Sequence, residues 1–476
     1  MTIAAVLLLA TAASAQVLVI TSGGRRAFDR EPDTADTNCL GWTYGASPAI
    51  GDRGELVGMY VASDALTQHC RVGIDSAVRF GDAIRFHALR ADGSWTTGVN
   101  VVDRASLDWM TDAAFLQQNL QTYAGHVASP SVVRRDGRWF MAFAMSRDDR
   151  NLCAGEHFAE GNACGSCLDP WSYFVVAWAV SEDGINWRVR ERAPGDPTLL
   201  GRPPTAAERT VPSNFKGLTR VSLVSQGGSF YIAAQYWAVD ALKIVMFRVP
   251  YDRSNEWGLG GEAEAVPTSL SGMLGSIVHT REGFIAFHSA SNRILYQTSQ
   301  NLVDWTPAVA LRSSIPFFAD GFGYEASVID PVAVEGAEGK LRLFFASADG
   351  DPEHGIARDG RHDCGIYSSF GPTAAYLGTG IYEAVVEPRV LRATTTTLVP
   401  RGNRLEVHVT APAGNVVIAD NGAFVIAPLM NGVATIELTP GDHTLYAWFD
   451  AQGDWDASRS PVILQRVIPP RRHAAR

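Results

Sequence analysis

The chain repeats one unit of roughly 50 residues, and this repeat limits the folds open to it more than any other feature. In its clearest copy, Ala128–Val133 is followed by a turn at Asp136-Gly137 and a strongly apolar segment at Arg138–Met145. A third segment at Tyr173–Val180 then leads to a turn that ends at Trp187. Each segment has the β-branched and aromatic residues of a half-buried or buried strand, bounded by Gly, Asp and Asn.

Four further copies follow the same plan. The better preserved one runs from Gly275 to Trp305, and the looser ones run from Ala46 to Trp95, from Arg220 to Trp257, and from Glu325–Ile329 through Lys340–Ala346. Four short strands per repeat predict a β-propeller, and five copies predict five blades. Val17–Ile20 is predicted to be a strand that closes the ring against the last blade. The segment Ala105–Tyr123 has a roughly helical apolar spacing and is a candidate short helix between blades one and two.

Two predicted blade ends identify a family resemblance. Ser181-Glu-Asp-Gly-Ile-Asn-Trp187 and Ser299-Gln-Asn-Leu-Val-Asp-Trp305 resemble the blade ends of five-bladed glycoside hydrolases, the arabinanases, β-xylosidases, invertases and their relatives. Ala128-Ser-Pro-Ser-Val-Val133, followed by its Gly turn and aromatic strand, is similar to a blade start of the same group. The resemblance covers about residues 40–375 and implies a propeller that acts on carbohydrate.

The pattern changes near Arg392, where short alternating segments and Asn-Gly or Pro-Gly turns begin. This is typical of a small β-sandwich. Asn431–Thr435 and Pro440–Leu445 closely resemble bacterial immunoglobulin-like repeats, which implies a spacer or adhesive module that contacts cell-surface components. The predicted fold is therefore all-β, a five-bladed β-propeller with a C-terminal immunoglobulin-like β-sandwich. The predicted parts are a signal peptide at 1–15, the propeller at 16–392, the sandwich at 393–470 and a tail at 471–476.

The N-terminal residues predict export. An apolar stretch that includes Leu8–Ala10 is followed by Ala13-Ser14-Ala15, a small-x-small cleavage site. A transmembrane anchor is the alternative, but the apolar run is short and is interrupted by Thr11 and Ser14. The mature protein is thus expected to be secreted, periplasmic or at the cell surface, and not to span a membrane. With 46% apolar and 19% charged residues the chain can bury a core, and its net charge of −10 argues against nucleic acid as a partner.

All the cysteines follow the predicted cleavage site, and their even number in an exported chain favours disulfides. They are Cys39, Cys70, Cys153, Cys164, Cys167 and Cys364. The Cys164-Gly-Ser-Cys167 pair has zinc-site spacing and His157 or His362 are possible further ligands, but no second Cys pair follows at zinc-site spacing. We therefore expect disulfides rather than a metal, and no cofactor.

The insertions Ser63–Ala83, Asp148–Trp171 and Asp349–Cys364 join second to third strands, so they are expected at the channel mouth where ligands of such propellers bind. Glycoside hydrolysis needs paired carboxyl groups there. The starts of blades one, two and three, at Trp42–Pro48, His126–Pro130 and Gly217–Val221, contain no acid.

The residues expected at the mouth fall into two groups. Candidate catalytic residues are Glu325, Asp148, Asp149 and His126, and candidate substrate-binding residues are Trp42, Tyr44, His69, Arg220 and Tyr324. Aromatic rings with a few polar groups suit sugar rings and hydroxyls. Alternatively, Glu325 and Arg220 form an ion pair in the channel and His126 is a hydrogen-bonded core residue. His279 and His288 alternate with apolar residues and are expected to be structural.

Two functions remain open from the sequence. The first is an exported carbohydrate-active enzyme, a candidate glycoside hydrolase acting on a polysaccharide or oligosaccharide. The second is a non-catalytic propeller that binds glycan or protein at the cell surface. Two carboxyl groups at the mouth, about 5–10 Å apart, favour the enzyme, whereas one carboxylate among aromatic rings favours binding.

Overall fold

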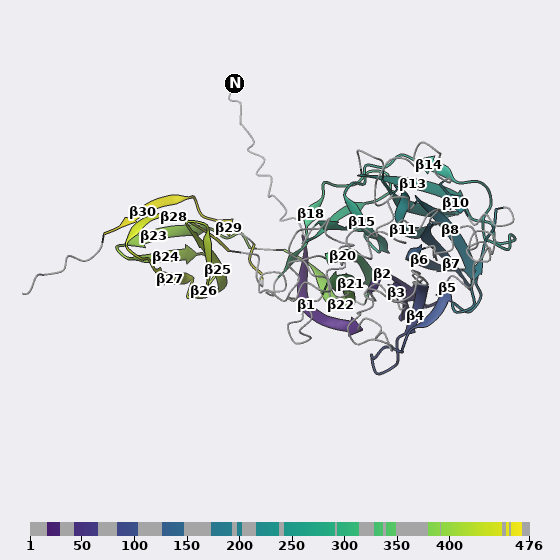
Figure 1. Ribbon diagram of the computed structural model, residues 1–476, viewed down its shortest axis with the longest axis horizontal. Coiled ribbons are helices and arrows are strands. Elements are labelled where there is room, and N and C mark those ends of the chain that lie inside the picture. The colour runs from purple at the N-terminus through teal and green to yellow at the C-terminus, as the bar shows by residue number, and fades with distance from the viewer. Residues whose placement is uncertain are drawn as a thin grey trace, which may run out of the picture. The chain divides into compact units, whose positions relative to one another are not determined.

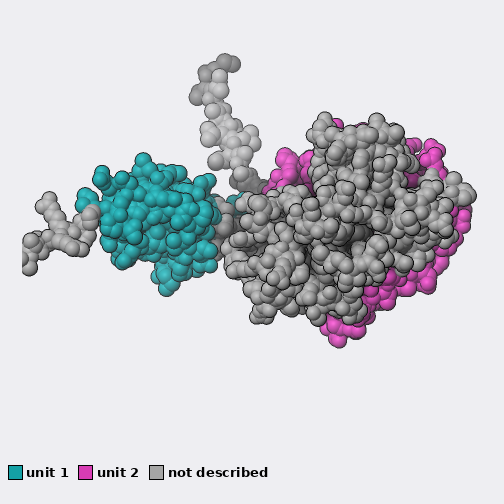
Figure 2. All heavy atoms as spheres, in the orientation of Figure 1, with its two compact units in different colours: residues 1–22, 311–317, 386–476 teal, residues 23–310, 318–385 magenta. Residues whose placement is uncertain are grey.

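The computed structural model is all-β, and no apolar helix of membrane-spanning length occurs in the part of the chain that it describes. The described residues are 17–28, 42–64, 83–102, 126–146, 173–192, 198–201, 216–237, 242–290, 293–313, 328–336, 339–348, 379–390, 392–449, 454–456 and 458–468. The chain divides into two compact units, coloured separately in Figure 2. One comprises residues 23–310 with 318–385, and the other comprises residues 386–476 with the short segments 1–22 and 311–317.

The described strands of the repeats form a five-bladed propeller, as the repeat pattern predicts. Blade one consists of β2 (Trp42–Ile50), β3 (Leu56–Asp64), β4 (Ala83–Ala88) and β5 (Val99–Val102). Blade two consists of β6 (His126–Arg135), β7 (Arg138–Ser146), β8 (Tyr173–Ser181) and β9 (Arg188–Val189), and β10 (Thr198–Leu200) also pairs with β8. Blade three consists of β11 (Lys216–Gln226), β12 (Ser229–Trp237), β13 (Leu242–Pro250) and β14 (Glu264–Val266). Blade four consists of β15 (Met273–Thr280), β16 (Gly283–Ala290), β17 (Arg293–Ser299) and β18 (Val309–Ala310).

The fifth blade combines both ends of the propeller sequence. It contains β20 (Val328–Glu335), β21 (Leu341–Ala348) and β22 (Thr379–Arg389), and β1 (Val17–Phe28) is the strand beside β22. The short β19 (Arg312–Ser313) pairs in parallel with β1. The prediction that Val17–Ile20 closes the ring is therefore confirmed. Figure 1 shows the innermost strands β2, β6, β11, β15 and β20 around the centre of the ring.

The innermost strand of blade five is β20, whose described residues begin at Val328 and pair with β21 through Glu335. The predicted start of this blade, Glu325–Ile329, overlaps β20 at Val328 and Ile329, and its residues 325–327 lie outside the described residues. In this pairing Val332 lies opposite Phe344, and both side chains are buried.

The core of the propeller lies between neighbouring blades. A large cluster with Phe140, Trp178 and Phe230 fills the seam between blades two and three, and similar clusters fill the seams one–two, three–four and five–one. The side chains of Trp178, Phe140 and Phe230 are fully buried, with ring centroids 5.0–5.9 Å apart. Each blade thus contributes both faces of its sheet to a core, which explains its nearly continuous apolar strands.

The two blade-end motifs form the same turn. In blade two, Ser181 Oγ accepts the Gly184 N–H at 2.9 Å, and Asp183 accepts the N–H groups of Ile185 and Asn186 at 2.8 Å. In blade four, Ser299 and Asn301 make the equivalent bonds. The Asn186 and Ile185 N–H groups also lower the pKa of the Asp183 carboxyl. These motifs are therefore structural turns at the outer end of a blade.

The C-terminal strands form a separate sandwich. They are β23 (Thr396–Arg401), β24 (Arg404–Val409), β25 (Ala413–Asp420), β26 (Ala423–Met430), β27 (Val433–Glu437), β28 (Gly441–Phe449), β29 (Ser458–Arg459) and β30 (Ile463–Val467). They pair as one eight-stranded sheet in the order β23-β24-β27-β26-β25-β28-β29, with β30 also paired to β28. A single residue pair, Met430 with Val433, joins β26 to β27, and the strands on either side of it enclose one apolar cluster.

The predicted Asn-Gly turns connect β25 to β26 and β26 to β27. Asn421, Gly422, Asn431 and Gly432 all have positive φ, as a two-residue type I′ hairpin requires. The strand between these turns, β26, was not predicted. Its burial pattern does not alternate at its start, because Ala423–Ile426 are all exposed.

Candidate functional site

A bulge occurs at the same place in the innermost strand of every blade. The pairing with the second strand shifts register after Tyr44, Ala128, Thr219, Leu274 and Ile329. In four of these bulges a residue has a left-handed backbone, namely Gly45 (φ 56°), Ser129 (φ 47°), Arg220 (φ 45°) and Asp330 (φ 51°). Bulges re-aim side chains, and strained non-glycine residues concentrate at functional sites. The ring of bulges is therefore the candidate site.

Two of the bulge residues form an ion pair. Arg220 of β11 in blade three donates through Nη1 to Oδ1 of Asp330 of β20 in blade five. Their side chains are 16% and 10% exposed, so the pair is largely desolvated but remains reachable. Gly275 of blade four follows Leu274 between them in the ring, and a Cβ there would lie 2.5 Å from the Pro331 carbonyl oxygen. Glycine at this position thus permits the close approach of blades four and five.

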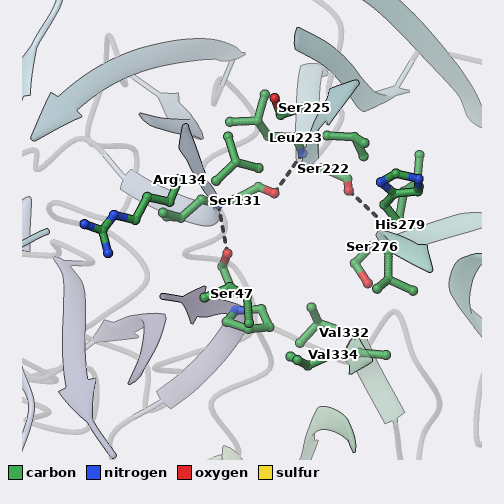
Figure 3. A pocket seen from close by; sticks show the side chains of 18 of the residues that line it. Ser47, Ser131, Arg134, Ser222, Leu223, Ser225, Ser276, His279, Val332 and Val334 are labelled. Atoms are coloured by element: carbon green, nitrogen blue, oxygen red, sulfur yellow. Dashed lines mark hydrogen bonds between the residues drawn. The ribbon is translucent and has the colours of Figure 1, made fainter. Parts of the chain in front are cut away.

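Beyond the bulges, the innermost strands carry serines that face the channel (Figure 3). We call Ser47, Ser131, Ser222 and Ser276 the serine belt. Ser47, Ser131 and Ser222 each accept, through Oγ, a backbone N–H from the innermost strand of the next blade: Val132 at 2.9 Å, Leu223 at 2.8 Å and Ile277 at 2.8 Å. Ser276 donates to the Pro331 carbonyl at 2.9 Å. Innermost strands have a free backbone edge, so these hydroxyls satisfy N–H groups that have no strand partner. In blade five the equivalent residue is Val332.

The channel holds a cavity of about 600 Å³, lined by the serine belt and by further residues of all five innermost strands. Figure 3 shows Ser47, Ser131, Ser222, Ser276 and Val332 around this open space. Charged groups surround its far end, where Arg134 lies 2.9 Å from Asp52 and Glu335 accepts the Arg281 N–H at 3.1 Å. The cavity thus extends from the serine belt toward the turns that join first to second strands.

Uncompensated polar groups lie in the seam between blades three and four. His288 of β16 and Gln235 of β12 are fully buried. Within the described part of the chain, both ring nitrogens of His288 lack a hydrogen-bond partner, and so does Nε2 of Gln235. Gln235 Oε1 accepts the Leu274 N–H at 3.1 Å, and Leu274 lies opposite His288 in the sheet. Burial lowers the pKa of His288 to about 4.

The predicted site residues divide into those that the structure describes and those that it does not. Arg220, a predicted substrate-binding residue, lies in the bulge of β11 and forms an ion pair with Asp330. Tyr44 is half-buried and packs against the apolar cluster of the five–one seam. Trp42 begins β2 and His126 begins β6, both at the channel-mouth end of innermost strands, and their side chains are not described. His288 is buried, as expected for a structural residue, whereas His279 is exposed and stacks on Phe284 at 4.6 Å.

The other predicted residues and segments lie outside the described residues and stay predictions. They are Glu325, Asp148, Asp149, His69, Tyr324, the helix at 105–123, the signal peptide and the disulfides of Cys39, Cys70, Cys153, Cys164, Cys167 and Cys364. Asp330 was missed, although Asp330-Pro331 stands in β20 where Ser129-Pro130 stands in β6. The segment singled out at the start of the last repeat, Glu325–Ile329, ends one residue before Asp330.

Comparison with solved structures finds five-bladed glycoside hydrolase propellers over most of the chain. A family 117 glycoside hydrolase of the marine bacterium Zobellia galactanivorans has 10% identity and a TM-score of 0.45, covering 78% of this chain and 91% of that one. Sucrose-6-phosphate hydrolase of Lactobacillus gasseri has 10% identity and a TM-score of 0.44, covering 94% and 88%. A family 32 β-fructofuranosidase of Bombyx mori has 9% identity and a TM-score of 0.42, covering 93% and 89%.

No protein-family model and no curated protein matches the sequence.

Proposed function

We propose that the propeller binds a carbohydrate at the mouth of its channel, with the Arg220–Asp330 pair as the polar centre of the site. The observation that supports this most is the position of the pair. Both residues occupy left-handed bulge positions on innermost strands of different blades, where the backbone is strained and the side chains are only partly exposed. Such strain is retained where it serves a ligand.

The chemistry of the pair suits a sugar. A carboxylate accepts hydrogen bonds from hydroxyl groups, and a guanidinium donates several in one plane. Together they offer acceptors and donors to neighbouring hydroxyls while the centre stays neutral overall. The aromatic residues expected around the mouth, Trp42, Tyr44 and Tyr324, would supply apolar contact to the sugar ring.

Hydrolysis is the second candidate, and Asp330 is the observation that favours it. Acid–base hydrolysis of a glycosidic bond requires two carboxyl groups on either side of that bond. Asp330 is a carboxylate on an innermost strand, so it would provide one of them. Glu325, which precedes it in the chain, is the second carboxylate that we propose for this reaction.

We further propose that the protein acts outside the cytoplasm after cleavage at Ala15, with disulfides among its cysteines. In this proposal the sandwich from about residue 393 attaches the propeller to the cell surface.

The proposal is tested by Asp330→Asn, which keeps the shape and removes the charge. The matched control is Glu335→Gln, a carboxylate at the far end of the same channel. Calorimetric titration with a panel of neutral oligosaccharides, xylotriose and sucrose among them, should show binding by the wild type and at least about tenfold weaker binding by D330N, with E335Q unchanged. Release of reducing ends by the wild type, absent in D330N, would establish the enzyme. Equal affinities of D330N and the wild type would show that Asp330 takes no part in binding.

A further inference from the structure

Exposed apolar residues gather on the C-terminal sandwich. Of the eleven large apolar residues most exposed in the described part of the chain, seven lie between Phe424 and Ile468. Four of these belong to β26: Phe424 is 62% exposed, Val425 43%, Ile426 54% and Met430 73%. A run of consecutive exposed apolar residues is unfavourable in water unless a partner covers it. Strand β26 is therefore the surface that needs an explanation.

Strand β26 is also an edge strand. It pairs along its whole length with β25, from Ala413 opposite Met430 to Asp420 opposite Ala423. On its other side, among the described residues, it pairs only through Met430 with Val433 of β27. Natural edge strands usually carry charges or proline, are short or contain a bulge, which blocks pairing with another chain. Ala423–Met430 contains no charged residue, and its proline, Pro428, lies outside the exposed segment Phe424–Ile426.

The position of Pro428 shows which backbone groups face the open edge. Proline has no N–H, so in a paired strand it takes a position where the N–H would point away from the ladder. Backbone groups alternate in direction along a strand, so Phe424, Ile426 and Met430 face the same way as Pro428. Met430 pairs with β27 on that side, which agrees. Phe424 and Ile426 thus each present an N–H and a C=O to the open edge.

We propose that β26 pairs antiparallel with β26 of a second copy of this chain, about a two-fold axis at Val425. In this register Phe424 lies opposite the copy's Ile426, and the two residues exchange backbone hydrogen bonds in both directions. The two Val425 side chains meet at the axis. Aromatic residues opposite β-branched residues are favourable cross-strand pairs. A strand without charges meets no like-charge repulsion from an identical strand, as a two-fold interface requires.

The aromatic rings beside β26 pack on one another. Tyr446 and Trp448 of β28 stack with ring centroids 5.6 Å apart, and Arg459 lies over the Tyr446 ring at 4.5 Å. Phe424 meets Trp448 edge-on at 5.7 Å, which orders the Phe424 side chain beside the edge. The open groups are the backbone edge of β26 and its apolar side chains, which fit an extended strand.

Sedimentation equilibrium of the full chain over a concentration series tests the pairing. The wild type should associate to a dimer, and Val425→Lys should weaken dimerisation at least about tenfold, because two like charges would meet at the axis. Leu464→Lys is the matched control: Leu464 is 80% exposed on β30 of the same sandwich, and its replacement should leave dimerisation unchanged. A wild type that stays monomeric throughout the series, or equal effects of V425K and L464K, would overturn the proposal.

A cysteine variant tests the register without adding charge. Residues facing each other in a non-hydrogen-bonded antiparallel pair have Cβ atoms about 4.5–5.5 Å apart, close to what a disulfide spans. Val425→Cys should therefore form a covalent dimer under mild oxidation, well above the background of the wild type, and Leu464→Cys should not. Equal cross-linking of V425C and L464C would contradict the two-fold axis at Val425. Far-UV circular dichroism of each variant confirms that it is folded.

Discussion

Replacing His288 with phenylalanine should remove an acid-sensitive element from the seam between blades three and four. His288 is fully buried, and its ring nitrogens have no partner in the described structure. Desolvation lowers its pKa to about 4, and the nearby Gln297 side chain opposes this shift only in part. Gln297 already accepts the Ser271 N–H at 3.2 Å and donates to the Thr306 carbonyl at 2.6 Å. The histidine is therefore neutral in the folded protein at neutral pH.

The expected magnitude follows from the difference in proton binding between the folded and unfolded chains. The unfolded histidine titrates near its ordinary pKa of about 6.5, so between about pH 6.5 and pH 4 the unfolded state binds a proton that the folded state does not. Because the folded pKa is lowered, the stabilisation is complete above this window and is lost as the pH falls. The free energy of unfolding that His288 removes is about 3 kcal/mol well below pH 4 and about 2.5 kcal/mol at pH 4.5.

Urea unfolding at about pH 7.5 and pH 4.5 measures this effect. Carboxyl groups titrate in both proteins, so the difference between wild type and H288F isolates His288. At pH 7.5 the free energy of unfolding of the variant should lie within about 2 kcal/mol of the wild-type value. Removing two unpaired buried nitrogens is favourable, and this offsets the cost of fitting the larger phenylalanine ring into the core. His279→Phe, at an exposed histidine of the same blade, is the control and should keep the acid sensitivity of the wild type. If H288F loses as much stability as the wild type between the two pH values, the reasoning is wrong.

Two further changes test single interactions. Ser222→Ala leaves the buried Ile277 N–H without its acceptor and should lower the free energy of unfolding by about 1–3 kcal/mol, whereas Ser225→Ala, which loses a bond to the Arg135 side chain, should cost less than about 1 kcal/mol in the same urea experiment. In the sandwich, the Thr439 carbonyl and Asp420 raise the pKa of buried His443, so its stabilisation is complete below the ordinary pKa of about 6.5 and is lost as the pH rises through the raised value. The melting temperature of His443→Gln should therefore lie furthest below that of the wild type near pH 6, and the difference should narrow toward about pH 9. A difference that does not depend on pH would show that His443 is not protonated in the folded protein.

Local patterns made the architecture predictable. Strand alternation, the Gly turns and the Ser-to-Trp blade ends depend on residues close together in the sequence, and each copy repeats them. The two Asn-Gly hairpins of the sandwich follow from the same kind of evidence, because left-handed turn residues have few alternatives. The closing strand at Val17–Ile20 was predictable too, because its apolar residues mark a strand at the start of the propeller sequence, and β1 lies beside β22 of the last blade.

The site depended on contacts that no local pattern records. Arg220 was singled out because it stands where an acid was expected, but its partner Asp330 lies 110 residues away and meets it only because both bulges face one channel. The segment that the repeat pattern singles out in blade five, Glu325–Ile329, ends one residue before Asp330. Strand β26 was missed because its first residues are exposed on both faces, so its sequence lacks the alternation that a buried face imposes.

The sequence by itself determined most of the described strands, the turns and the number of blades, because hydrophobic periodicity and turn chemistry act over a few residues. Only the tertiary structure decided which side chains meet at the channel and which strand edge stays open. Ring closure brings distant bulges to one axis, and sandwich assembly leaves β26, among the described residues, without a second neighbour for most of its length. Both outcomes depend on how the elements pack together, which is a property of the whole chain and not of any one segment.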